Sequence, residues 1–432
     1  MNDLEIIFNI LNNVIYKDKK SNDQINIFAK KALNLSYVTK VVYGVLENKI
    51  YLDYMIDKIS DIKLKKIHAN ILIILEMGFY NIHFLSTKDY ATVDKLVDLS
   101  KKKNKKSKGF VNAILRNFIR NEEDTAKIKI SDDIKSLSVR YSMPYELTRY
   151  IYDSYGMEYT KNFLRYTNQY VPLAIRVNRL KTTRDKLRDL LEKDGFNLRN
   201  SKISKNALIV ENPSGLIDST YFKEGFFTIQ GESSMKTVEV LNPSENTRIL
   251  DLCAAPGSKS SYLCEISQNT GKILANDISA KKLSLIEENI KRLGLKNISL
   301  SNFDASGFKK EFQEAFDYVL VDAPCSGLGL LARKPEIRYK RGMDDIYKLR
   351  DLQRKILDQA VKYVKKGGIL VFSTCTLGPI ENQDNFTYLK NKKDLSHQRI
   401  DNKDYLEYVP FEDMTDGFFI SKFKKKEYER DN

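Results

Sequence analysis

Histidine and cysteine are scarce in this chain of 432 residues. The three histidines, His68, His83 and His397, lie far from one another and from every cysteine. The four cysteines form neither a CxxC pair nor a disulfide-like framework, so we expect reduced thiols and no zinc or other metal site. Histidine acid-base catalysis has few candidates, and each histidine is expected at the surface or in packing.

Long apolar runs are also absent. No stretch approaches the roughly 18 uncharged residues that a membrane span requires, and the N-terminus lacks the charged, apolar and small-residue order of a signal peptide. We therefore expect a soluble, cytoplasmic protein without a membrane partner. The length favours two or three packed domains.

Positive charge is abundant and spread along the chain. The formal net charge is +15 and the sequence pI is about 9.2. This balance favours a polyanionic partner, with nucleic acid ahead of an anionic membrane. A genome bias towards lysine, asparagine and isoleucine would produce much of the same excess, so charge alone leaves both interpretations open.

Apolar residues recur at helical spacing up to about residue 120, as in Ile71, Ile74 and Leu75, which predicts an all-helical domain over residues 1–125. The lysine-rich stretch 101–108 is expected to be a loop before a helix that begins near Gly109. That loop is either solvated or in contact with a phosphate backbone. The acidic stretch 122–124 predicts a linker.

Residues 126–235 predict a helical linker followed by a small α+β module. RYSMPYELTRYIYDSYG, beginning at Arg140, is expected to form a helix. Short β-like runs then alternate with one helix, which Thr182 or Thr183 would cap. Arg176 and Lys181 lie in this module.

Residues 236–432 predict a doubly wound α/β domain, because short apolar runs are followed by amphipathic helices. A final run with alternating aromatic and polar residues, 416–425, predicts an edge strand. The other expected strands are 248–253, 272–277, 298–304, 317–324 and 367–376, and the expected helices are 258–267, 280–294 and 346–364.

Polar and small residues follow the first three strands, where open α/β sheets bind ligands. The turn 251–259 lets a ligand approach the backbone, and its lack of a GxGxxG pattern weakens a dinucleotide interpretation. Asp277 and Asp304 end the next two strands, where carboxylates could bind the ribose and adenine of a nucleoside. A single such aspartate is more often a helix cap, but acids in successive equivalent positions favour a nucleoside site.

The next two strands end near a second group of reactive side chains. Asp322 and Cys325 lie at the end of the fourth strand, and Cys375 lies at the end of the fifth. In the usual strand order the first, fourth and fifth strands are adjacent, so both thiols should face one pocket. Cys264, on an apolar helix face, is expected to be inert, and Cys253 is expected to line the turn mainly with its backbone.

Several of these motifs resemble those of a known enzyme family. CAAPGSK, DAPCSGLGLLARKPEIR and STCT are similar to stretches of the NOL1/NOP2/Sun family of RNA cytosine-5 methyltransferases. The helical front, with FVNAILRNFIR, resembles the NusB-like domain of members that modify bacterial 16S ribosomal RNA, and the resemblance covers nearly the whole chain. It implies an all-α NusB-like domain, a small α+β RNA-binding module and a Rossmann-like domain that binds S-adenosyl-L-methionine. Arg176 and Lys181 of the small module are then expected to help select the RNA through backbone contacts.

The resemblance also implies site roles, with 16S ribosomal RNA as partner and a monomer as the default state. Cys375 would attack carbon 6 of cytosine, Asp322 would hydrogen-bond the ring near its nitrogen, and Cys325 would help to release the product. The residues alone do not order the thiols, since DNA cytosine-5 methyltransferases attack with the Pro-Cys thiol. The implied cofactor-binding residues are Cys253, Ala254, Ala255, Pro256, Gly257, Ser258, Lys259, Asp277, Asp304 and Asp322.

Two departures from the family pattern leave local loop geometry open. Residues 378–382 read GPIEN where the family often has Pro-Glu-Glu-Asn, and Ser258 replaces a common second glycine. The placement of Glu381 and Asn382 is therefore uncertain from the sequence. The alternatives are a cytosine-5 methyltransferase that acts on transfer RNA or another ribosomal site, and a non-catalytic RNA-binding scaffold.

Overall fold

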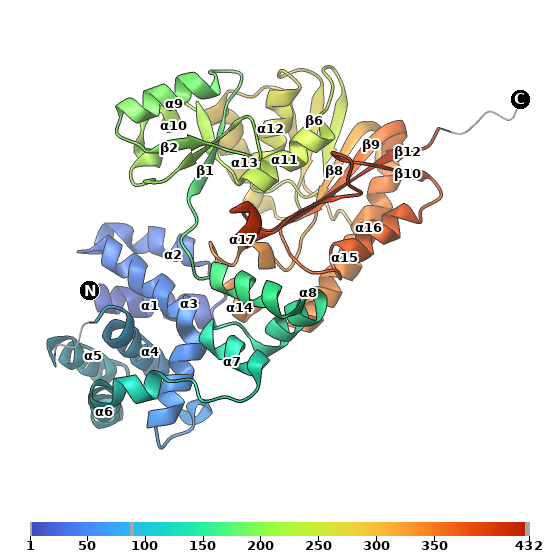
Figure 1. Cartoon of the computed structure of the whole chain (residues 1–432). Coiled ribbons are helices and arrows are strands. Elements are labelled where there is room, and N and C mark those ends of the chain that lie inside the picture. The colour runs from blue at the N-terminus through green and yellow to red at the C-terminus, as the bar shows by residue number, and fades with distance from the viewer. Residues whose placement is uncertain (1, 87–89, 428–432) are drawn as a thin grey trace, which may run out of the picture. The chain divides into compact units, whose positions relative to one another are not determined.

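The computed structural model describes residues 2–86 and 90–427, which form two compact units (Figure 1). The first unit contains Met1–Gln169 and Leu331–Met343, and the second contains Tyr170–Leu330 and Asp344–Asn432. Within the described ranges, every helix is too short or too polar to span a membrane.

Helices make up the N-terminal part of the first unit, as the apolar periodicity predicts. The first helix begins with a capping box, in which Asn2 and Glu5 each accept a hydrogen bond from the other's backbone amide. Apolar side chains such as Ile74 and Phe118 are buried in one continuous core. The helices are α1 (Asp3–Tyr16), α2 (Ser21–Phe28), α3 (Leu35–Ile59), α4 (Ala69–Phe84), α5 (Tyr90–Lys103) and α6 (Lys108–Ala126).

Two charged stretches that were predicted to be a loop and a linker are largely helical. Lysines 101–103 form the last turn of α5, where cations interact favourably with the helix C-terminus, and Lys105–Ser107 form a 3-10 turn. The acidic residues 122–124 lie inside α6, which bends at Asn121 and continues. Lys58 Nζ donates hydrogen bonds to the carbonyls of residues 124 and 125, which stabilises this longer helix end.

The remainder of the first unit contains α7 (Asp133–Arg140), α8 (Tyr145–Tyr166) and the short α14 (Ile337–Lys340). The single helix predicted from Arg140 is wrong at its start, because a turn intervenes and α8 begins after Pro144. The residue before a proline is disfavoured in helical geometry, which explains the break. Arg338 of α14 is fully buried, and its guanidinium donates hydrogen bonds to the carbonyls of Glu47, Tyr141, Ser142 and Thr167 and to the side chain of Asn168.

The second unit begins with the expected small α+β module. Its antiparallel sheet has the order β2-β3-β1-β4. Thr183 caps α9 (Arg184–Lys193) by accepting a hydrogen bond from the amide of Lys186, so Thr183 is the cap and Thr182 is not. The strands are β1 (Leu173–Val177), β2 (Leu198–Asn200), β3 (Ala207–Val210) and β4 (Phe227–Ile229).

A larger sheet with the order β10-β12-β9-β8-β5-β6-β7 dominates the second unit. The five strands from β9 to β7 are mutually parallel, and β5, β8 and β9 are neighbours, as predicted. The strands are β5 (Arg248–Asp251), β6 (Lys272–Asn276), β7 (Ile298–Ser301), β8 (Phe316–Asp322), β9 (Val364–Thr374), β10 (Leu395–Gln398), β11 (Leu406–Tyr408) and β12 (Phe418–Lys425).

Helices cover both faces of this sheet. Leu320 and Val371 pack on one face with α11 and α12, whereas their neighbours Val319 and Leu370 pack on the other with α15 and α16. This division follows from the two-residue period of a strand. The helices are α11 (Glu232–Leu241), α12 (Ser258–Ile266), α13 (Ala280–Leu293), α15 (Met343–Tyr363) and α16 (Gln383–Lys390).

The prediction that 416–425 forms an edge strand is wrong. β12 lies inside the sheet, antiparallel to β9 on one side and to β10 on the other, and it also pairs with β11. Phe419 and Ile420 are buried on opposite faces, which fits an interior strand. The short, mostly polar run of β10 gives little sequence signal, so its pairing with β12 was missed.

Candidate active site

A cavity of about 380 Å³ lies at the carboxyl ends of the parallel strands, where α/β sheets bind ligands. Its walls come from the turn after β5, from the ends of β6, β8 and β9, from the segment after β7, and from α13 and α15. The lining residues are Leu252, Cys253, Ala255, Asp277, Ile278, Lys282, Asp304, Ala305, Asp322, Ala323, Pro324, Cys325, Leu352, Ile356 and Cys375.

The turn between β5 and α12 requires glycine at one position. Gly257 has a φ of +95°, and a Cβ atom there would lie 2.9 Å from Cγ2 of Ile286. The amide of Ala255 donates a hydrogen bond of 3.2 Å to Oδ2 of Asp277, which ties the turn to the end of β6. Ser258, at the position of the family's second glycine, forms the first residue of α12 without a positive φ.

Two of the strand-end acids lie on the cavity wall and also stabilise their own turns. Asp277 Oδ1 accepts a hydrogen bond from the amide of Ser279, and Asp304 Oδ1 accepts hydrogen bonds from the amide and hydroxyl of Ser306. The Ser306 bonds hold the pKa of Asp304 below its usual value. A carboxylate can accept about four hydrogen bonds, so both residues keep acceptor capacity for a ligand.

The cavity also has an apolar wall that sequence reasoning missed. Ile278 directly follows Asp277 and is 68% exposed, while Leu352 and Ile356 lie one helical turn apart on α15. An exposed isoleucine next to a cavity carboxylate offers a surface against which an aromatic base can pack. The Asp-Ile pair at a strand end is the signal that could have indicated it.

The two thiols face the same cavity, as predicted. Sγ of Cys325 and Sγ of Cys375 are 3.3 Å apart. This hydrogen bond, together with burial, raises the pKa of the Cys325 thiol well above its ordinary value. Cys325 therefore stays protonated at neutral pH and can donate a hydrogen bond to a thiolate on Cys375.

Asp322 is held through both carboxylate oxygens. Lys259 Nζ lies 2.5 Å from Oδ2, and the hydroxyl of Ser373 donates a hydrogen bond of 2.9 Å to Oδ1. Lys259 is only 8% exposed, and its ammonium also lies 5.3 Å from the ring centroid of Phe418. Lys259 thus places a proton-bearing group directly against Asp322 at the cavity wall.

Glu381, whose placement the sequence left open, is a buried anchor for the loop that carries Cys325. Its carboxylate accepts hydrogen bonds from the amide and hydroxyl of Ser326 and, at 2.9 Å, from Nε2 of Gln353. Ser326 directly follows Cys325. The carboxylate therefore fixes the backbone next to that thiol.

Asn382 plays the corresponding part for the loop that carries Cys375. Its side-chain oxygen accepts a hydrogen bond of 2.5 Å from Thr374 Oγ1, and its side-chain nitrogen donates one of 3.1 Å to the carbonyl of Thr376. These two threonines flank Cys375. The departure from the family's Pro-Glu-Glu-Asn pattern thus still leaves an acid and an amide buried behind the two thiols.

The remaining predicted site residues divide into two groups. Cys253 lines the cavity, and burial raises the pKa of its thiol well above the ordinary value. Burial likewise raises the pKa of Cys264 to about 11, which agrees with the expectation of an inert residue. The other residues of this segment are not among those that line the cavity: Ala254, Pro256 and Gly257 belong to the turn, and Ser258 and Lys259 begin α12.

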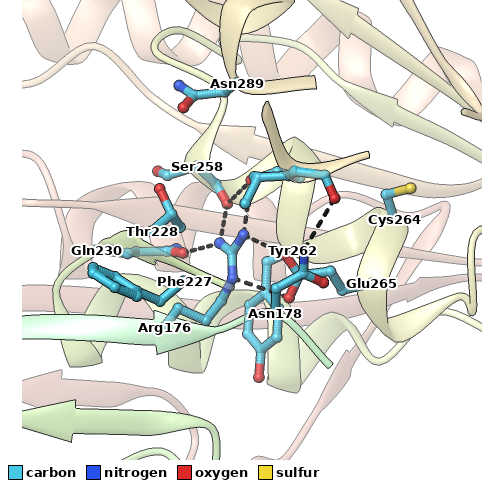
Figure 2. A network of polar contacts seen from close by, with 12 residues as sticks. Arg176, Asn178, Phe227, Thr228, Gln230, Ser258, Tyr262, Cys264, Glu265 and Asn289 are labelled. Atoms are coloured by element: carbon cyan, nitrogen blue, oxygen red, sulfur yellow. Dashed lines mark hydrogen bonds and ion pairs between the residues drawn. The ribbon is translucent and has the colours of Figure 1, made fainter. Parts of the chain in front are cut away.

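The prediction that Arg176 contacts RNA is wrong. Its side chain is fully buried and forms an ion pair of 2.7 Å with the buried Glu265 of α12 (Figure 2). The guanidinium also donates hydrogen bonds to Gln230, to the carbonyl of Ser258 at 2.6 Å, and to the hydroxyl of Ser261. Arg176 therefore ties the small module to the helix that follows the cavity turn.

Lys181 is exposed, but its ammonium donates hydrogen bonds to the carbonyls of Glu224 and Arg292. The second of these carbonyls lies in the last turn of α13, where a cation is favourable. Its contact with RNA stays a prediction.

The parallel sheet, the glycine turn and the strand-end acids together define a Rossmann-like methyltransferase domain whose cofactor is S-adenosyl-L-methionine. The 16S rRNA methyltransferase RsmB/F family matches residues 238–424, the NusB family matches 1–120, and an RsmF/B-like ferredoxin-like domain matches 143–216. The chain belongs to the ribosomal RNA small subunit methyltransferase B family, and it is an RNA methyltransferase.

Relatives and solved structures agree with this placement. A probable ribosomal RNA small subunit methyltransferase B of Bacillus subtilis is 33% identical, over 97% of this chain and 94% of its own. The Salmonella heidelberg protein of the same name, without "probable", is 30% identical over 90% of each chain. The crystal structure of PH0851 covers 97% of both chains with a TM-score of 0.82 and 25% identity.

A further crystal structure, of NSun6 from Pyrococcus horikoshii with SFG, an analogue of S-adenosyl-L-methionine, is 26% identical to this chain. It covers 66% of this chain and 99% of its own, with a TM-score of 0.59. The predicted NusB-like, small α+β and Rossmann-like folds are confirmed.

Proposed function

We propose that this protein methylates carbon 5 of a cytosine in 16S ribosomal RNA, with Cys375 as the covalent nucleophile. The observation that carries the proposal is the pair of thiols 3.3 Å apart in the cavity that Asp322 also lines. Carbon 5 of cytosine is a poor nucleophile until a thiolate adds to carbon 6. The names of the relatives support ribosomal RNA as the substrate.

The strand-end residues fit the cofactor. S-adenosyl-L-methionine supplies an electrophilic methyl group when it is bound. We propose that Asp277 accepts hydrogen bonds from its ribose hydroxyls, that Asp304 contacts the adenine edge, and that Ile278 packs against the adenine ring. The turn that would follow its backbone comprises Cys253, Ala254, Ala255, Pro256, Gly257, Ser258 and Lys259.

The protein side chains account for bond making and breaking on the base. The Cys375 thiolate forms the bond to carbon 6, and the displaced electron pair moves towards ring nitrogen 3. The Lys259–Asp322 pair supplies a hydrogen bond and a proton there, which stabilises the developing charge. Asp322 does not act alone in this step, because its Oδ2 lies 2.5 Å from Lys259 Nζ.

Product release regenerates the nucleophile. After carbon 5 has gained the methyl group, it loses its proton to water, and the carbon–hydrogen electron pair forms the double bond between carbons 5 and 6. The bond between Cys375 and carbon 6 breaks with its electron pair returning to sulfur, and ring nitrogen 3 returns its proton to the Lys259–Asp322 pair. The S–H of Cys325, 3.3 Å away, can donate a hydrogen bond to the departing thiolate. Cys325 thereby favours elimination. The target base must be unpaired or flipped to reach both groups.

Substitution of each thiol tests these assignments. Cys325→Ala should accumulate a denaturant-resistant covalent adduct with labelled RNA, whereas Cys375→Ala should form none. Cys264→Ala, which removes a thiol that is not part of the cavity lining, serves as the control and should leave turnover unchanged. An adduct with Cys375→Ala and none with Cys325→Ala would exchange the two roles.

The substrate requires a separate test. Incubation of the protein with protein-free 16S ribosomal RNA and labelled S-adenosyl-L-methionine should give 5-methylcytosine. If no 5-methylcytosine forms, the proposed activity is wrong. Mapping methylated cytosines in RNA from cells with and without the gene distinguishes 16S ribosomal RNA from transfer RNA or another ribosomal site. A non-catalytic scaffold predicts RNA binding without methylation, which the two intact cavity thiols disfavour.

The same proposal assigns a role to each part of the chain. Residues 1–125 and 126–235 bind RNA, and residues 236–432 carry out catalysis. The chain acts as a monomer, which sedimentation at working concentration can test.

A further inference from the structure

A second cleft, of about 340 Å³, lies in the first unit between α7 and α8. Three exposed cations line it: Arg140 at the end of α7, and Lys161 and Arg165 on α8. The rest of the lining is Asp133, Ser136, Leu137 and Tyr141. This cluster is outside the cavity that holds the thiols and has no part in the chemistry proposed above.

In the part of the chain that the structure describes, the three cations have no acidic partner within ion-pair distance, although Asp133 also lines the cleft. Across residues 2–86 and 90–427, none of them forms an ion pair or a side-chain hydrogen bond. Elsewhere in the same unit, Lys49 is paired with both Asp53 and Glu76. Lys161 and Arg165 are four residues apart on one helix face, where like charges destabilise a helix. A ligand with negative charge would offset that repulsion.

The walls of the cleft are held in place by a buried guanidinium. Arg338 donates hydrogen bonds to the carbonyls of Tyr141 and Ser142 at the end of α7, and to that of Thr167 at the end of α8. These residues directly adjoin Arg140 and the last turn of α8. The backbone next to Arg140 and Arg165 is therefore held in place before any ligand binds, which lowers the entropic cost of binding.

An adjoining cleft of about 470 Å³ shares Arg140 and contains aromatic surface. Its lining includes Lys127, Tyr51 and Phe84, and Phe84 is 40% exposed. Cations that follow a phosphate backbone, next to an aromatic face on which a base can stack, are the usual composition of a surface for single-stranded nucleic acid.

We propose that Arg140, Lys161 and Arg165 bind the phosphate backbone of the substrate RNA at a site separate from the target cytosine, with a neighbouring base at Phe84. The inference rests on the proposed function only for the identity of the polymer. Phosphate contacts position a nucleic acid without reading its sequence. The cleft thus contributes affinity and register.

The test uses the full chain with the triple substitution Arg140→Gln, Lys161→Gln and Arg165→Gln. The matched control is Lys63→Gln, Lys65→Gln and Lys66→Gln, which removes the same charge from exposed lysines of the same unit. Binding of protein-free 16S ribosomal RNA is measured over a series of salt concentrations. Each lost phosphate contact lowers the slope of log K against log salt by about 0.7 to 0.9, so the cleft variant should lose about 2 and bind roughly 100-fold more weakly near physiological salt.

The control variant should retain the wild-type slope to within about 0.5, and both variants should keep the wild-type Tm and affinity for S-adenosyl-L-methionine. Equal weakening by both variants would show that net charge alone matters and would overturn the proposal. Unchanged RNA binding by the cleft variant, with loss of inorganic phosphate binding in a parallel titration, would assign a small-anion site and also overturn it. This experiment measures RNA binding, whereas methylation of carbon 5 is measured separately with the wild-type protein. Failure of one proposal can therefore be told apart from failure of the other.

Discussion

Replacing Arg176 by methionine should strongly destabilise the second unit. The change removes a buried guanidinium that makes an ion pair of 2.7 Å with Glu265 and hydrogen bonds with Gln230, Ser258 and Ser261. Breaking one side of such a buried pair leaves an uncompensated charge, which costs about 3 to 5 kcal/mol. For a unit of this size we expect Tm to fall by about 6 to 20 °C.

The double variant Arg176→Met with Glu265→Leu separates the cost of an orphaned charge from the loss of packing. Replacing both partners by apolar residues should recover most of the lost stability, because the desolvated carboxylate is gone. The control is Arg199→Met, which breaks an ion pair of 3.0 Å with Glu211 in the same module. Both of those side chains are nearly half exposed, so this change should cost less than about 1 kcal/mol.

The pH dependence gives the sign of the effect. Burial already raises the pKa of Glu265, and its pairing with Arg176 opposes that rise, so the pKa rises further in Arg176→Met. A carboxyl with a raised folded-state pKa favours the folded state at low pH and loses that benefit as pH rises. The Tm deficit of Arg176→Met should therefore grow between about pH 5 and pH 8. The reasoning would be refuted if Arg176→Met were as stable as Arg199→Met. It would also be refuted if the double variant were no more stable than Arg176→Met alone.

Three further changes test the cavity and the first unit. Gly257→Ala should weaken S-adenosyl-L-methionine binding at least ~10-fold by calorimetry, because φ is +95° and Cβ would meet Ile286; an unchanged Kd would contradict this. Glu381→Ala should lower kcat about 10- to 100-fold, because the Cys325 loop would be misplaced, while the Kd for the cofactor stays constant. Loss of both activity and cofactor binding would indicate general unfolding instead. Burial raises the pKa of Glu47 from 4.5 to about 7, so stability falls as pH rises across that range. Glu47→Gln should flatten that fall in a Tm series, and two parallel profiles would count against it.

The order of the parallel strands and the meeting of the two thiols could be predicted because both follow from local patterns and a general topology rule. Apolar runs locate strands, and reactive residues placed at the carboxyl ends of adjacent strands must meet. The meeting of Cys325 and Cys375 could therefore be predicted without knowing which distant segments pair. The place of β12 in the sheet could not, because its second neighbour, β10, is short and mostly polar.

Charged residues were predicted least well. Arg176 is of a residue type that often contacts RNA. Its partner Glu265 lies 89 residues further along the chain, so no local sequence pattern connects the two. The acids at 122–124 suggested a linker, but Lys58 satisfies the carbonyls of the helix that contains them. Lys259 was assigned to the cofactor turn from its place in a motif, and the fold directs its ammonium to Asp322. Long-range pairing decides whether a charge is exposed, and it is absent from local sequence.

Leu331–Met343 are a short excursion of the catalytic half of the chain into the helical unit. An N-terminal deletion up to Gln169 would leave the buried Arg338 guanidinium with none of the carbonyls that satisfy it. The helices up to Gln169 are therefore not separable from Leu331–Met343. A domain exchange in this protein therefore has to replace both stretches of the first unit, Met1–Gln169 and Leu331–Met343, at the same time. The same holds for deletions.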